Sequence, residues 1–173
     1  MIDRIIQLSE NRFLRLFLVG LAFLSMQTTL FNELRPFGVS LEIMLLMAAS
    51  SGLARGSHEG AIAGFIVGLM YDMVLTTPLG LCAAVFALVG YLAGFVHSFV
   101  HDPTWWSQML LGAGASVAGM LLMPVAFTLT GVAGILTPRV FLIALVVASF
   151  NGPLSYPVAK VCKWALREAP VMR

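Results

Sequence analysis

Two acidic residues inside apolar sequence are the strongest candidates for chemistry in this chain. Glu42 and Asp72 each interrupt a long apolar run, and Thr76 and Thr77 follow Asp72 about one helical turn later. If these runs cross a bilayer, an ionised carboxylate near its middle costs at least about 2.5–3.5 kcal/mol, so each acid needs a partner or a proton. Two converging carboxylates would share a proton or bind a cation. We therefore predict a polar pocket formed by Glu42, Asp72, Thr76 and Thr77.

Asp72 also continues a series of glycines spaced four residues apart. Successive members of such a series turn about 400° around a helix and therefore drift by only about 40°. A ridge of small residues lets a neighbouring backbone approach closely. Asp72 should then face a neighbouring helix, where it either clamps two helices through a hydrogen bond to Ser, Thr or Tyr, or contacts an ion, a proton or a ligand. The glycines of this ridge are Gly56, Gly60, Gly64 and Gly68.

The remaining reactive side chains form no recognisable catalytic pattern. His97 and His101 stand four residues apart, a spacing that suits a metal, but neither an HExxH nor a cysteine-rich pattern accompanies them. Cys82 and Cys162 lie in or beside apolar runs, where cysteine usually behaves as a small hydrophobe. Phosphate-binding loops and Ser-His-Asp arrangements are also absent from the sequence. We predict no catalytic residue, no cofactor and no bound metal.

Composition decides which elements must position these residues. The chain has 173 residues, of which 60% are hydrophobic and only 10% charged, and its mean hydropathy is +0.95. Soluble domains carry about 25% charged residues. The excess of apolar surface requires the bilayer as solvent, which excludes a secreted protein, a cytosolic enzyme and a nucleic-acid binder.

Long apolar runs bounded by charge, proline or glycine predict six transmembrane helices. The short separators between them force successive helices to lie antiparallel. We therefore predict an all-α membrane protein, with residues 1–173 forming one compact integral membrane bundle. The predicted spans are roughly 13–31, 39–55, 60–76, 79–100, 107–130 and 137–158.

Positive charge predicts the orientation of this bundle. Eight of the ten Lys and Arg residues fall on the side that holds both termini, and only Arg35 and Arg139 fall on the other. This excess predicts that both termini are cytoplasmic. In the C-terminal tail, Lys160, Lys163 and Arg167 surround Trp164, a combination that favours the headgroup layer and anionic membrane lipid.

The sixth predicted span contains two helix-breaking sites. Asn151-Gly152-Pro153 and Tyr156-Pro157 should kink the helix and free backbone carbonyls. Such breaks sometimes mark transporter sites. Alternatively, they fit the final helix against its neighbours.

Residues 60–95 resemble the core of the MreD family, the rod-shape-determining integral membrane proteins of bacteria. The family pattern is a glycine-rich helix that runs into G-L-x-x-D, a turn with P-L-G, and an apolar helix that ends in G-Y-L. With the glycine ridge, Pro78 and Gly80 complete the surface on which we expect helix packing or partner binding. The matching residues are Gly68, Leu69 and Asp72, then Pro78, Leu79 and Gly80, then Gly90, Tyr91 and Leu92.

The resemblance implies a role rather than a reaction. MreD-like proteins are non-enzymatic members of the cell-wall elongation machinery in the bacterial inner membrane. They associate with an MreC-like single-span protein, and through it with the transpeptidase and glycosyltransferase of peptidoglycan synthesis and with MreB-type filaments. The family is also similar to the six-helix substrate-binding (S) component of energy-coupling-factor vitamin transporters, which supplies the main alternative. An ion-coupled carrier is a third reading, supported by Glu42, Asp72 and the broken sixth span.

Overall fold

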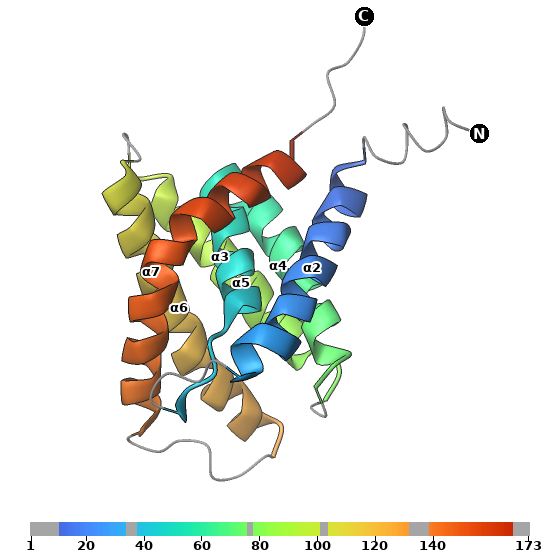
Figure 1. Ribbon diagram of the computed structural model, residues 1–173, viewed down its shortest axis with the longest axis vertical. Coiled ribbons are helices and arrows are strands. Elements are labelled where there is room, and N and C mark those ends of the chain that lie inside the picture. The colour runs from blue at the N-terminus through green and yellow to red at the C-terminus, as the bar shows by residue number, and fades with distance from the viewer. Residues whose placement is uncertain (1–10, 34–37, 76–77, 101–103, 132–138, 168–173) are drawn as a thin grey trace, which may run out of the picture.

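The computed structural model is all-helical over the residues it describes, which are 11–33, 38–75, 78–100, 104–131 and 139–167. The predicted fold class is confirmed: six helices follow one another in the order expected from the sequence (Figure 1). They are α2 (Arg12–Glu33), α3 (Ile43–Arg55), α4 (Ser57–Asp72), α5 (Leu81–His97), α6 (Trp105–Leu129) and α7 (Arg139–Ala165).

The helices differ in how far they could reach across a bilayer. Three of them, α2, α6 and α7, are long and apolar enough to cross a membrane, whereas α3 and α5 are shorter apolar helices. At about 1.5 Å per residue, the 13 residues of α3 extend only about 20 Å, less than the ~30 Å thickness of the hydrocarbon core.

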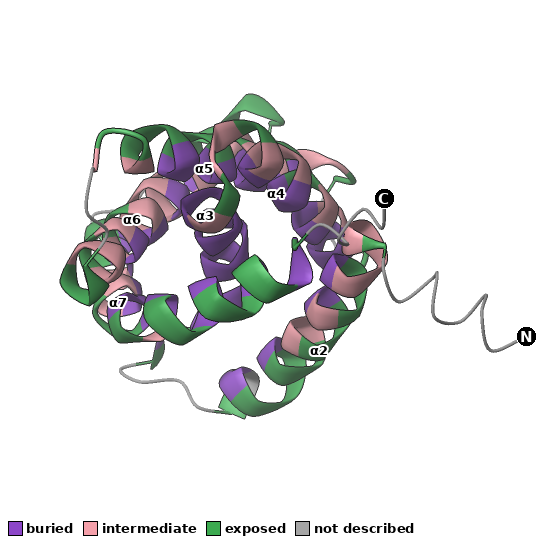
Figure 2. Ribbon diagram, turned by 90° about the horizontal axis from the view of Figure 1, so that it is seen from above, coloured by how far each residue is buried: buried purple, intermediate pink, exposed green. Residues whose placement is uncertain are grey.

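The short helix α3 is the centre of the bundle. Every residue from Ile43 to Leu53 is buried, and α3 packs against all five other helices. Figure 2 shows it enclosed by α4, α5, α6 and α7, with α2 along the remaining side. Because α3 is largely apolar and is buried on all its faces, its neighbours surround it, and the bundle is organised around it.

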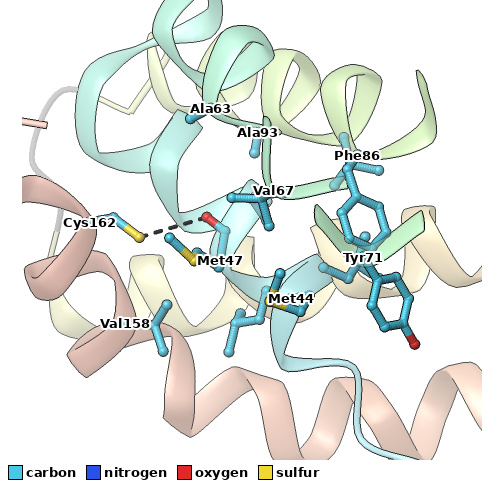
Figure 3. Packing of buried hydrophobic residues seen from close by; sticks show 14 of the residues in the cluster. Met44, Met47, Ala63, Val67, Tyr71, Phe86, Ala93, Val158 and Cys162 are labelled. Atoms are coloured by element: carbon cyan, nitrogen blue, oxygen red, sulfur yellow. Dashed lines mark hydrogen bonds between the residues drawn. The ribbon is translucent and has the colours of Figure 1, made fainter. Parts of the chain in front are cut away.

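The core combines flexible and aromatic side chains from several helices (Figure 3). Met44 and Met47 of α3 are fully buried. The rings of Tyr71 and Phe86 stack with centroids 5.8 Å apart and join α4 to α5. The thiol of Cys162 lies 3.7 Å from the carbonyl oxygen of Met47 and is buried, as expected for a small hydrophobe.

The last helix is longer than the predicted span. Proline at positions 153 and 157 does not end α7, which runs on to Ala165, and Figure 1 shows its C-terminal half leaning across the end of the bundle. Inside a helix, proline removes one backbone hydrogen bond and crowds the preceding turn. When neighbouring helices pack against both halves, the helix bends at the proline and does not end there.

The bundle has two chemically different ends. We call the end that holds Arg15, Arg55, Lys160 and Lys163 the basic end, and the end that holds Glu42 and Asp72 the acidic end. The start of α2 and the finish of α7 lie together at the basic end, where the Arg15 guanidinium donates a hydrogen bond to the carbonyl oxygen of Arg167.

Candidate functional site

At the acidic end, Asp72 is the most enclosed acidic group of the described chain. It is the last residue of α4 and is only 2% exposed. Its carboxylate accepts three hydrogen bonds from backbone N–H groups that begin α5: Oδ2 from Gly80 at 2.9 Å and Ala83 at 3.1 Å, and Oδ1 from Cys82 at 3.1 Å. Asp72 is therefore a clamp between two helices, with backbone rather than side chains as its partner.

The sequence around the turn explains this arrangement. The first N–H groups of a helix have no partner within the helix and carry the positive end of its dipole, so they attract an anion. Gly80 precedes α5 with φ of 95°, a left-handed conformation that glycine adopts without strain. Pro78 is exposed, and its carbonyl oxygen accepts a hydrogen bond from the Leu81 N–H at 3.3 Å. The turn thus aims the start of α5 at the carboxylate that ends α4.

The glycine ridge of α4 lies against helices of this same chain. A Cβ atom on Gly64 would lie 2.3 Å from the carbonyl oxygen of Phe86, and one on Gly68 would lie 2.6 Å from the Cα of Ala83. Both positions therefore need glycine for α4 and α5 to touch backbone to backbone. The neighbour that the structure places on this ridge is α5.

Near the basic end, a third helix joins the same contact. A Cβ on Gly60 would lie 2.5 Å from both the Cα of Gly52 in α3 and the carbonyl oxygen of Gly90 in α5. Gly56, with φ of 92°, forms the turn between α3 and α4, and a Cβ on Gly94 would lie 2.4 Å from its carbonyl carbon. The glycines of three helices therefore meet one another, and α3, α4 and α5 form one tightly packed unit.

Glu42 occupies a different polar site, just before α3. Its carboxylate accepts hydrogen bonds from Gln27 Nε2 at 3.1 Å and from the Tyr71 hydroxyl at 3.2 Å. The same Gln27 side chain accepts a hydrogen bond through Oε1 from the Met44 N–H at 2.8 Å. Gln27 therefore satisfies the start of α3, much as Asp72 satisfies the start of α5.

Two cavities flank Glu42 and Tyr71. One of about 290 Å³ opens toward α2 and is lined by Gln27, Thr28 and Ser40 among others. The other, of about 240 Å³, lies toward α6 and is largely apolar, with Met120, Met123 and Phe127 in its wall. Asp72 is not among the described residues that line either cavity.

Of the four residues of the predicted pocket, Thr76 and Thr77 lie outside the described residues. Glu42 and Asp72 both lie at the acidic end, but each has its own hydrogen-bond donors. Glu42 takes side-chain donors from α2 and α4, whereas Asp72 takes backbone donors from the start of α5.

The family of the chain follows from the comparison of its sequence with known families. Residues 8–163 match the family model described as rod shape-determining protein MreD. The chain belongs to the MreD family. Neither curated proteins nor solved structures gave a match. The likeness to the S component of vitamin transporters therefore stays a prediction.

In this MreD-family chain, the most specific segment of the sequence builds the α4–α5 pair. The segment runs from Gly60 to Phe95 and supplies the glycine ridge, the Asp72 clamp and the turn at Gly80. The family pattern thus coincides with the residues that let two helices touch and that fix the start of the second helix.

Three polar residues of the MreD-family bundle had not been singled out as site residues. Besides Gln27 and Tyr71 at the Glu42 carboxylate, Asn151 of α7 donates from Nδ2 to Ser116 Oγ at 3.0 Å and to the Glu42 backbone carbonyl at 3.3 Å. A glutamine or asparagine inside an apolar span is the signal that could have found Gln27 and Asn151, because burial forces such an amide to find partners. From the sequence, Asn151 is predicted only to be part of a helix kink.

The histidine pair falls partly outside the described residues. His97 ends α5 at the basic end, where it lines a cavity with residues of α3, α6 and α7, and His101 is not described. Within the described ranges, no group of three or more His, Cys, Asp or Glu side chains comes together. The side chains of Gln27, Asp72 and Asn151 form hydrogen bonds that join one helix to another.

Proposed function

We propose that this MreD-family protein is a non-enzymatic membrane scaffold of the bacterial cell-wall elongation complex. Membership of the family implies a role in the determination of rod shape. The observation that carries the scaffold proposal is how the buried polar groups are used. Asp72, Gln27 and Asn151 all link one helix to another, which suits a rigid body that presents its outer surface to partners.

The proposed direct partner is an MreC-like single-span protein. Through it the chain would reach the transpeptidase and glycosyltransferase of peptidoglycan synthesis, and MreB-type filaments indirectly. The α4 glycine ridge already lies against α5, so we propose that a partner helix meets the bundle on its exposed outer surface. Substitutions in the ridge would then act on partner binding through the fold.

We further propose a multi-pass location in the bacterial inner membrane, with both termini cytoplasmic. Three helices long and apolar enough to cross a membrane support the location. Among the described cations, the basic end gathers Arg12, Arg15, Arg55, Lys160 and Lys163, while Arg139 begins α7 at the other end. This asymmetry supports a cytoplasmic basic end.

Untargeted co-purification from native membranes in mild detergent tests the scaffold proposal. We expect mass spectrometry to identify an MreC-like protein together with wall synthases. Recovery of a membrane coupling subunit with paired ATPases would instead make the chain the binding subunit of a transporter.

A pair of glycine variants links this test to the fold. In cells that depend on the protein for their shape, Gly64→Leu should abolish rod shape and recovery of the partner, because the site is filled by α5 backbone. Gly114→Ala is the matched control, since a Cβ there meets no atom within 4 Å. Normal shape and normal partner recovery with Gly64→Leu would contradict the role assigned to the ridge.

A further inference from the structure

At the basic end, a cavity of about 330 Å³ opens between the ends of four helices. Among its described lining residues there are two lysines, one histidine and one glutamine, and no acid. The Tyr156 ring and aliphatic side chains of α3 and α7 form the rest of the wall. The residues are Leu53, Ala54, His97, Gln108, Tyr156, Ala159, Lys160 and Lys163. The cavity therefore presents donors and positive charge, the chemistry of an anion site.

Three arginines of the basic end make contacts outside the lining of this cavity. Arg12 pairs with Glu59 at 2.9 Å. Arg15 and Arg55 donate to carbonyl oxygens at the end of α7. The two lysines of the cavity, by contrast, lie three residues apart and share a face of α7.

One of these lysines is held in place by an aromatic ring. The Lys160 ammonium lies 4.4 Å from the centroid of the Tyr156 ring, a cation–π contact that favours this position of the side chain. Lys160 also lines the cavity. An anion entering the cavity meets a positioned charge and loses less side-chain entropy than at a freely moving lysine.

A separate apolar groove of about 320 Å³ lies along α5 and α6. Ala93 lines the groove, and His97, one turn further along the same face of α5, lines the cavity. On α6, Leu111 lines the groove, and Gln108, one turn earlier, lines the cavity. On both α5 and α6, residues of the groove and of the cavity therefore lie about one helical turn apart.

One glycine in this groove, Gly114, is not required by close packing against another part of the chain. Among the helical glycines that the structure describes, Gly114 alone would place a Cβ with no atom within 4 Å. Glycine inside a helix is less favourable than alanine by about 0.8–1 kcal/mol. At Gly60, Gly64 and Gly68 that cost is offset by close helix contact. At Gly114 the missing side chain leaves the groove open.

We propose that an anionic phospholipid binds here, with its phosphate between Lys160 and Lys163 and one acyl chain in the α5–α6 groove. Basic pockets between membrane helices are suited to anionic headgroups, and the neighbouring groove supplies a place for hydrocarbon that a soluble phosphate would not use. The proposal is independent of which protein partners the chain binds.

Lipid binding to the purified full-length protein tests the proposal by native mass spectrometry. The probes are phosphatidylglycerol, phosphatidylcholine and inorganic phosphate, each added alone. Phosphatidylglycerol should be retained in preference to the other two. Because each lysine contributes about 1 kcal/mol near an anionic lipid, the double variant Lys160→Gln/Lys163→Gln should weaken phosphatidylglycerol binding roughly 30-fold. The matched control Arg139→Gln, at the other end of α7, should not weaken it.

A second variant separates the groove from the lysines. Gly114→Leu should fill the groove and lower phosphatidylglycerol retention. The unfolding temperature should not fall below that of the wild type, because a Cβ at this position meets no atom within 4 Å and leucine favours a helix more than glycine does. Equal retention of phosphatidylcholine, or wild-type retention by the lysine double variant, would overturn the proposal. Retention of inorganic phosphate without phosphatidylglycerol would also overturn it, by assigning the cavity to a free anion.

Discussion

The Asp72 carboxylate accepts a hydrogen bond from the backbone N–H of Ala83 at 3.1 Å, and so the last side chain of α4 caps the first turn of α5. Backbone groups in hydrocarbon have no water to satisfy them, so an uncapped helix start inside a membrane bundle is costly. Asp72 accepts from Gly80 and Cys82 as well, and the helix dipole adds to the attraction. One carboxylate thereby fixes the angle between two helices whose glycines must touch.

Asp72→Asn should destabilise the bundle because it removes the charge and turns one acceptor oxygen into a donor that faces N–H groups. Hydrogen bonds to charged groups are worth about 1.5–3 kcal/mol each, so we expect a loss of at least that size. A mixed-micelle unfolding titration of the purified protein measures it. The matched control is Glu33→Gln, which removes an exposed carboxylate at the end of α2 and should shift stability by less than about 0.5 kcal/mol. Equal effects of the two variants would contradict the clamp.

Gly64→Ala should destabilise the protein although alanine is the better helix former. The new Cβ would lie 2.3 Å from the Phe86 carbonyl oxygen, so α4 and α5 would have to separate, and overpacking of this kind costs about 1–3 kcal/mol. The matched variant Gly114→Ala adds the same methyl group where no atom lies within 4 Å. It should stabilise the protein by up to about 1 kcal/mol. Thermal unfolding of the two variants in one detergent checks the opposite signs.

The helices and their order could be predicted from the sequence because apolar runs and charged separators are local signals. The four-residue glycine spacing likewise indicated a face for close packing, although not which helix would lie on it. Gly90 and Gly94 of α5 stand four residues apart in the same way, and both lie against backbone of the α3–α4 unit, at Gly60 and Gly56. The matching glycine spacings in α4 and α5 could therefore have predicted that these two helices pack against each other.

The partners of the carboxylates could not be predicted from the sequence in the same way. Depth along a span places Glu42 and Asp72 at one end of the bundle but says nothing about their direction around the helix axes. The Asp72 partners are backbone N–H groups, which carry no sequence signal of their own. Gln27 of α2 forms hydrogen bonds with Glu42 and Met44 because the fold brings α2 next to the start of α3.

Gln27→Leu should destabilise the bundle by leaving the buried Met44 N–H without its acceptor and Glu42 without one donor. An unsatisfied buried group costs about 1–3 kcal/mol. The control is Thr29→Val on the same helix, since Thr29 is exposed and bonds only to the Ser25 carbonyl of its own helix at 2.6 Å. Unfolding titrations of both variants test the difference, and an unchanged Gln27→Leu would show that the cap contributes nothing.

The finish of α7 depends on side chains from other helices, as the starts of α3 and α5 do. Arg55 at the end of α3 donates to the Leu166 carbonyl, and Arg15 of α2 donates to that of Arg167. Cations at a helix C-terminus are favoured by the dipole, and here they also tie the last turn to the core.

Arg55→Gln should therefore speed amide hydrogen exchange at Leu166 and Arg167, whose N–H groups close that turn, while exchange near Ala144 in the middle of α7 stays slow. Arg139→Gln, at the start of α7, is the matched loss of charge and should leave exchange in the last turn unchanged. If the amide hydrogens of the last turn exchanged equally fast in both variants and in the wild type, the arginine caps would not hold the end of α7 against the bundle.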